Sequence, residues 1–124
     1  MTHIIPVPFE FSDDDLENIV ITALEGGIGY WACLDNDNGD FSDQPDDMPT
    51  SEWCWKLLND GGQLHFLDAE DLAGEEWYMD YADLFNGIRK AIKNRDWNGD
   101  MDLMDAAVAD CIFQYAMCGG VIFG

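Results

Sequence analysis

Aspartate and asparagine alternate along residues 96–102 in a pattern that suggests a calcium loop. The segment DWNGDMD precedes a predicted helix, and Ca²⁺ prefers carboxylate and amide oxygens at this spacing. The candidate ligands are Asp96, Asn98, Asp100, Asp102 and Asp105. Neither register completes the pattern, because a loop from Asn94 has a poor first ligand and a loop from Asp96 has Met101 where glycine belongs. We therefore expect a turn that caps two helices, with a calcium-dependent interaction module as the alternative.

Known catalytic signatures are missing from the sequence. The two histidines are His3, near the start, and His65, in a predicted strand, and no spacing of serine, histidine and acid matches a catalytic motif. Carboxylates are so numerous that an acid and a base could be named almost anywhere, so such pairs carry no information. The sequence indicates a protein that is not an enzyme and that holds no cofactor.

An acid close to aromatic residues offers a second chemical possibility, a pocket for a small ligand. Glu25 stands before a glycine pair, and Tyr30 and Trp31 follow it. These three side chains could line a pocket between subunits, although a helix end followed by a core strand explains the same residues. Asp110 and Gln114 are one helical turn apart, and we interpret them as a narrow solvent-facing stripe, with a buried functional pair as the alternative.

Acidic residues dominate the composition. The chain has 26 acids and 5 bases, a formal charge of −21, and Lys56 is the only basic residue before Arg89. Such a charge disfavours nucleic acid and anionic membranes as partners and favours a basic protein surface, a metal ion or a cationic ligand. The alternative is an acidic protein whose charges serve solubility alone.

The size of this charge resembles that of DNA. A compact chain of this length should be about 35 Å across, and duplex DNA of that length carries about 20 phosphate charges. The acids predicted to face a basic partner lie in a polar loop and in a later connection between strands. They are Asp35, Asp37, Asp40, Asp43, Asp46 and Asp47, then Asp68, Glu70, Asp71, Glu75 and Glu76.

Length and hydrophobic patterning predict one domain, residues 1–124, of the α+β class. The run from Asp102 to Met117 is apolar on nearly all sides, which predicts a central C-terminal helix and makes a homodimer plausible. We expect a small, mostly antiparallel sheet and three to four helices around it. Residues 3–9 contain two prolines and suit an edge strand or a leading arm.

Capping residues and runs of β-forming residues predict the positions of the other helices and strands. Ser12 should cap a first helix that ends at Gly26, and Asp80 should cap a later one. Strands are expected at residues 28–34, 63–67 and 77–79, with a short last strand at 121–123. Thr50 could cap a helix, but residues 53–58 could also form a strand.

The spacing of the four cysteines indicates the redox state of the compartment in which the protein is found. Cys33, Cys54, Cys111 and Cys118 are widely spaced and form no CxxC pair, which indicates reduced side chains in the cytoplasm. The first ten residues contain neither a basic segment nor a long apolar run, so no secretory signal is expected.

Several motifs together resemble a group of small proteins encoded by phages and prophages. They are TALEGGIGYW at residues 22–31, the stretch 58–71, FNGI at 85–88 and the closing residues 111–124. The resemblance implies the cytoplasm of an infected bacterium. Small acidic phage proteins often resemble DNA in charge and block CRISPR effectors or restriction enzymes. We therefore expect an inhibitor that binds a basic, nucleic-acid-binding host defence protein by DNA mimicry, with a protein that binds or sequesters a nucleotide or other small ligand as the alternative.

Overall fold

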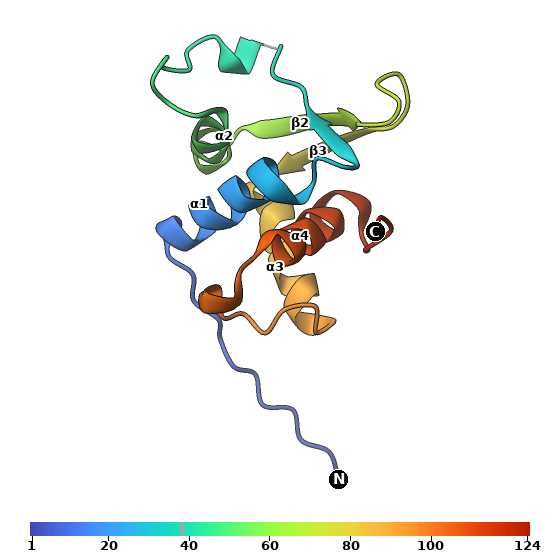
Figure 1. Ribbon diagram of the computed structural model, residues 1–124. Helices are drawn as coiled ribbons and strands as arrows, with labels where there is room; N and C mark the ends of the chain where they lie inside the picture. The colour runs from blue at the N-terminus through green and yellow to red at the C-terminus, as the bar shows by residue number, and fades with distance from the viewer. Residues whose placement is uncertain (38) are drawn as a thin grey trace.

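Helices and a small sheet form two layers. The computed structural model describes residues 1–37 and 39–124. Four α-helices and a three-stranded antiparallel sheet give the α+β fold that the sequence predicts. Helices α1 (Asp13–Thr22), α3 (Tyr81–Lys93) and α4 (Ala106–Cys118) lie on one side of the sheet, and α2 (Thr50–Asn59) lies at its end (Figure 1).

The sheet runs in the order β1 (Ala32–Leu34), β2 (Gln63–Asp68) and β3 (Glu76–Asp80). Side chains alternate between its two faces, as they must in extended strands. Phe66 and Trp77 are paired in register and buried toward the helices. His65 and Tyr78 form the next pair and lie on the opposite, open face. The sheet therefore presents one polar face that no helix covers.

The predicted helix starts are confirmed where a capping box specifies them. The Ser12 hydroxyl accepts from the Asp15 backbone N–H at 3.1 Å, and Asp80 accepts from Asp83 at 2.8 Å. The ambiguous segment after residue 50 is a helix, but Pro49 occupies the N-cap position that the sequence assigned to Thr50.

Two element boundaries differ markedly from the predictions. The predicted strand 28–34 forms only at Ala32–Leu34. A π-helical turn at Ala23–Gly27 is followed by a tight turn at residues 28–31, and this second turn contains Tyr30 and Trp31. The C-terminal helix begins at Ala106 rather than Asp102, since the Asp105 carboxylate accepts from the third residue of the helix.

The predicted strand at residues 121–123 is wrong. Its backbone hydrogen bonds go to the side chain of Gln114 instead of a neighbouring strand.

Helix α4 is the centre of the helical layer. Ala109, Ile112 and Phe113 are fully buried in the hydrophobic core, which draws residues from α1 through α4 and from all three strands. The crossing of α3 over α4 is close, because a Cβ built at Gly87 would lie 2.3 Å from the backbone oxygen of Ile112. Only glycine allows this approach without moving one helix.

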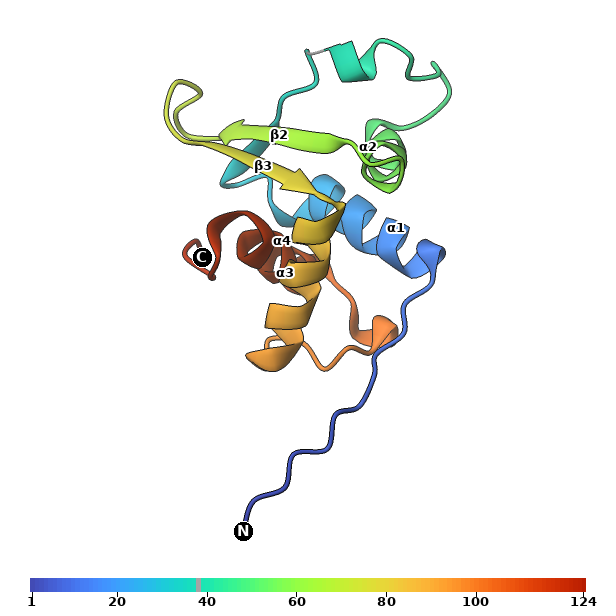
Figure 2. The ribbon, with the colours of Figure 1, turned by 180° about the vertical axis from the view of Figure 1, so that it is seen from behind.

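The first ten residues leave the body as an extended arm, visible from both sides (Figures 1 and 2). Of the two sequence interpretations, edge strand or arm, the structure shows the arm. Within the described part of the chain, the helices are all too short or too polar to cross a bilayer.

Candidate functional site

The acidic loop between β1 and α2 is held in place by hydrogen bonds to its backbone. The Trp53 indole N–H donates to the backbone oxygen of Asp40 at 3.0 Å, and the Gln44 amide donates to that of Met48 at 2.9 Å. Five carboxylates of the loop are exposed on this anchored backbone: Asp37, Asp40, Asp43, Asp46 and Asp47. Asp35 is half-buried. The loop therefore presents its negative side chains on a backbone that hydrogen bonds hold in place.

The connection between β2 and β3 is shaped by its own aspartates. Asp68 accepts from the Glu70 backbone N–H at 2.9 Å, and Asp71 accepts from that of Ala73 at 3.1 Å. These local bonds are the turn-forming contacts that short acidic side chains make. Glu70, Asp71, Glu75 and Glu76 are exposed, whereas Asp68 is half-buried.

The structure brings both predicted acidic segments to the sheet-bearing part of the molecule. The loop 35–49 and the β2–β3 connection lie on the sheet side, and the last turn of α3 lies at the opposite end, in both views (Figures 1 and 2). Residues 35–83 carry fifteen acids and one lysine, whereas residues 89–105 carry four acids and four bases. The sheet end therefore carries acids with almost no basic residues, whereas four of the five basic residues lie toward the opposite end, together with the acids of residues 89–105 and of the start of α1.

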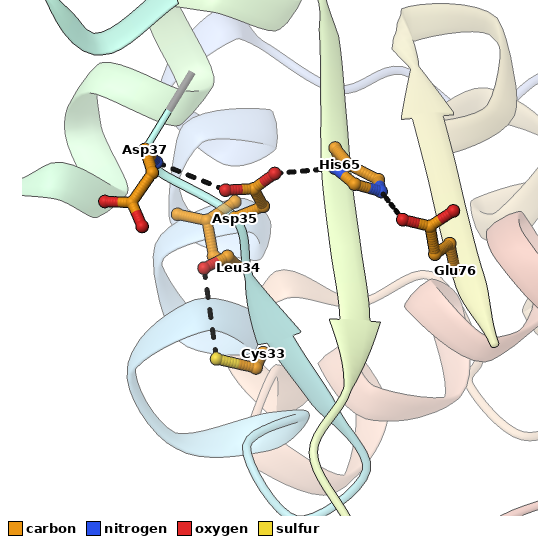
Figure 3. A network of polar contacts seen from close by, with 6 residues as sticks. All are labelled: Cys33, Leu34, Asp35, Asp37, His65 and Glu76. Atoms are coloured by element: carbon orange, nitrogen blue, oxygen red, sulfur yellow. Dashed lines mark hydrogen bonds and ion pairs between the residues drawn. The ribbon is translucent and has the colours of Figure 1, made fainter. Parts of the chain in front are cut away.

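A polar cluster on the open face of the sheet includes two of the predicted acids (Figure 3). His65 contacts Asp35 through Nδ1 at 2.9 Å and Glu76 through Nε2 at 3.1 Å, and its ring stacks on Tyr78. The hydrogen bonds from His65 and from the Asp37 backbone hold the pKa of Asp35 below its usual value. The sequence did not predict this cluster, although strand alternation places His65 and Glu76 on one face.

A second polar cluster joins the turn before β1 to helix α4. Asp110 accepts from the Tyr30 hydroxyl at 2.5 Å and from the Trp31 indole N–H at 2.8 Å. Gln114 donates to Asp110 at 3.0 Å and accepts from the backbone N–H groups of residues 122 and 123, both at 2.8 Å. Partial burial and the neighbouring Asp110 carboxylate raise the pKa of Tyr30 to about 12.

The solvent-stripe interpretation of Asp110 and Gln114 is therefore wrong. The Gln114 side chain is 0 % exposed, and it serves as the junction between the turn, the helix and the C-terminal residues. A polar side chain in an apolar helix was the one signal in the sequence. Gln114 is buried, as the alternative of a buried pair predicts, whereas Asp110 is half-buried.

The three predicted pocket residues are divided between two sites. Tyr30 and Trp31 line a surface pocket of about 270 Å³ together with Asp68, Glu70 and the C-terminal residues. Glu25 lines a different pocket of about 250 Å³, where its carboxylate accepts from the Ser51 hydroxyl at 2.8 Å. Glu25 lies within the π-helical turn Ala23–Gly27, and a second turn at residues 28–31 carries Tyr30 and Trp31 toward α4 instead.

The calcium candidates act as local caps and turn formers. Asp100 accepts from the Asp102 backbone, Asn98 accepts from that of Asp100, and Asp105 caps α4. Asp96 accepts from the Tyr115 hydroxyl. Over residues 1–37 and 39–124, no three His, Cys, Asp or Glu side chains gather as a metal site would require.

Comparison with known proteins gave no match to a family model, to a curated protein or to a solved structure.

Proposed function

We propose that this protein is a non-enzymatic, phage-encoded inhibitor that acts in the cytoplasm of the bacterial host. It binds a nucleic-acid-binding defence protein, such as a CRISPR effector or a restriction enzyme, and presents carboxylates where DNA phosphates would lie. The observation that carries this proposal is the uneven charge, with fifteen acids and one lysine between residues 35 and 83. A basic groove attracts such a surface for the same electrostatic reason that it attracts DNA.

The anchored backbone of the acidic loop supports the same conclusion. Carboxylates on a mobile chain would lose conformational entropy when they bind, whereas carboxylates on a supported loop lose less. The Trp53 indole holds the loop at Asp40, and the Gln44 amide donates to the hydroxyl of Thr50, the first residue of α2, at 3.2 Å. Four of the five basic residues lie between residues 89 and 95, at the opposite end, so a basic partner should contact the sheet end.

The test is competition with a DNA duplex for purified defence proteins, measured with two charge variants. Each variant replaces five acids with amides, so both lower the net negative charge equally. The test variant carries Asp37→Asn, Asp43→Asn, Asp46→Asn, Asp47→Asn and Glu70→Gln. The control variant carries Glu10→Gln, Asp13→Asn, Asp14→Asn, Glu17→Gln and Asp102→Asn.

We expect the wild-type protein to displace the duplex and to bind more weakly as salt rises. An exposed ion pair contributes about 0.5 kcal/mol, so the test variant should lose about 2.5 kcal/mol, which is roughly 70-fold in affinity. The control variant should bind within a few-fold of wild type. Equal losses in both variants, or binding that salt does not weaken, would contradict the proposal.

A second candidate function follows from the pocket beside Tyr30 and Trp31. Aromatic walls with Asp68 and Glu70 at the rim favour a small organic cation over an anionic nucleotide. Thermal stabilisation by simple amines but not by nucleotides would support it, and stabilisation by neither would contradict it.

A further inference from the structure

The N-terminal arm exposes a continuous run of apolar side chains. Ile4 is 90 % and Ile5 81 % exposed, and Val7 is also exposed. Contiguous apolar surface of this kind marks an interaction site. Pro6 and Pro8 restrict the backbone to extended conformations, so the arm loses little conformational entropy when it docks.

Helix α3 carries an apolar stripe that the rest of the chain leaves partly uncovered. One side of the helix packs on α4 through Gly87 and neighbouring buried residues. A second stripe, Phe85, Ile88 and Ile92, recurs at helical spacing and lines a groove of about 310 Å³. Phe85 remains 48 % exposed there. The groove is mostly apolar, and its volume is within the range of pockets that take up an apolar group.

The arm of the same chain does not fill this groove. Phe9 and Phe11 form one wall of it, and the Phe9 ring lies so close to Gly99 that a Cβ there would be 2.7 Å from it. This contact fixes the root of the arm, and the residues before it lead away from the body (Figures 1 and 2). The chain thus offers an apolar segment and an apolar groove that do not meet each other.

Charge identifies the occupant of the groove as the arm of a second copy. Two copies that each carry −21 repel one another over most of their surfaces. Residues 1–9 contain no acid, and the groove is flanked by Arg89 and Lys93. Glu10 and Asp13, which follow the arm, complement these two cations. We propose that residues 3–8 of each copy dock in the α3 groove of the other, which gives a symmetric dimer by reciprocal arm exchange.

The proposal is independent of the function proposed above, because the groove is lined by residues of α3 and of the root of the arm and not by the acidic loop or the β2–β3 connection. The salt dependence of binding distinguishes dimerisation from binding to a basic partner. Screening weakens the repulsion between copies, so dimerisation should strengthen as salt rises, whereas binding of the acidic end to a basic partner should weaken.

Sedimentation equilibrium of the full chain tests the exchange with three variants. Ile4→Ser with Ile5→Ser impairs the arm, and Phe85→Ser impairs the groove. Leu72→Ser is the matched control, because Leu72 is 61 % exposed on the β2–β3 connection, away from arm and groove. We expect the arm and groove variants each to weaken dimerisation about a hundredfold and the control to leave it unchanged.

A mixing experiment distinguishes exchange from other ways of pairing. Arm-impaired and groove-impaired chains should each be monomeric alone, but together they should form heterodimers, since one intact arm then meets one intact groove. If Phe85→Ser loses its helical signal, Arg89→Glu at the exposed rim replaces it in both experiments. A wild-type chain that stays monomeric up to about 1 mM, or a groove variant that still dimerises, would overturn the proposal.

Discussion

Replacing Gln114 with leucine should destabilise the fold markedly while keeping the volume of the side chain. The Gln114 amide donates to Asp110, to the Tyr30 hydroxyl and to the backbone oxygen of Phe123. Its carbonyl accepts from the backbone N–H groups of Ile122 and Phe123. Gln114 thereby joins the turn before β1, helix α4 and the C-terminal residues.

The magnitude follows from these five contacts. A net contribution of about 1 kcal/mol per hydrogen bond would give about 5 kcal/mol. Ile122 is exposed and Phe123 is half-buried, so water can satisfy most of the released backbone groups, and Asp110 keeps its bonds to Tyr30 and Trp31. We therefore expect the free energy of unfolding to fall by about 3 kcal/mol, measured by urea titration with tryptophan fluorescence.

Two further measurements connect this loss to the proposed contacts. The Trp31 ring stacks on Phe123 with centroids 4.9 Å apart, so release of the C-terminal residues should alter the native-state tryptophan emission. In a double-mutant cycle, Tyr30→Phe and Gln114→Leu should be coupled by about 0.5–1.5 kcal/mol. A loss under about 1 kcal/mol, additive variants and unchanged emission would refute the assigned role of Gln114.

Three other predictions concern titration and packing. The pKa of Tyr30 is raised to about 12, so its contribution to the free energy of unfolding is present below pH 10 and is lost as pH rises toward 12. Ultraviolet titration should show a tyrosine that ionises at high pH, and Tyr30→Phe should remove this signal. Asp35 has a lowered pKa, so its contribution is present above its ordinary value of 3.8 and is lost as pH falls through the lowered value; His65→Gln should bring the carboxyl signal back toward 3.8 in an NMR titration. Gly87→Ala should cost about 2–4 kcal/mol in urea titration because its Cβ would strike a backbone oxygen of α4, whereas Gly29→Ala, with open space around it, should be nearly neutral.

Local chemistry explains which elements could be predicted from the sequence. Ser12 and Asp80 specify helix starts through bonds that reach only three residues along the chain, so a short stretch of sequence contains the whole interaction. The strands at 63–68 and 76–80 follow from alternation for the same reason. The β-forming residues Tyr30 and Trp31 misled the strand prediction, because contacts with α4 hold them in a turn.

The polar clusters depend on distance in space, which a periodic pattern does not contain. Asp110 and Gln114 have the spacing of an exposed stripe, and only the packing of the turn before β1 against α4 buries Gln114 and half-buries Asp110 at one junction. Composition likewise predicts the amount of negative charge. Its concentration at the sheet end depends on the loop and the β2–β3 connection both lying on the sheet side of the molecule, away from the last turn of α3 (Figure 1).

The bonds from Tyr30 and Trp31 to α4 span about eighty residues, and this has a consequence for synthesis on the ribosome. A nascent chain that stops before residue 110 holds an indole and a phenol whose acceptor has not been made. Contacts between such distant residues form late because a long loop must close first. The turn that contains Tyr30 and Trp31 can therefore form its hydrogen bonds only after α4 has been synthesised. Chains that terminate before residue 110 should be substrates for chaperones and proteases.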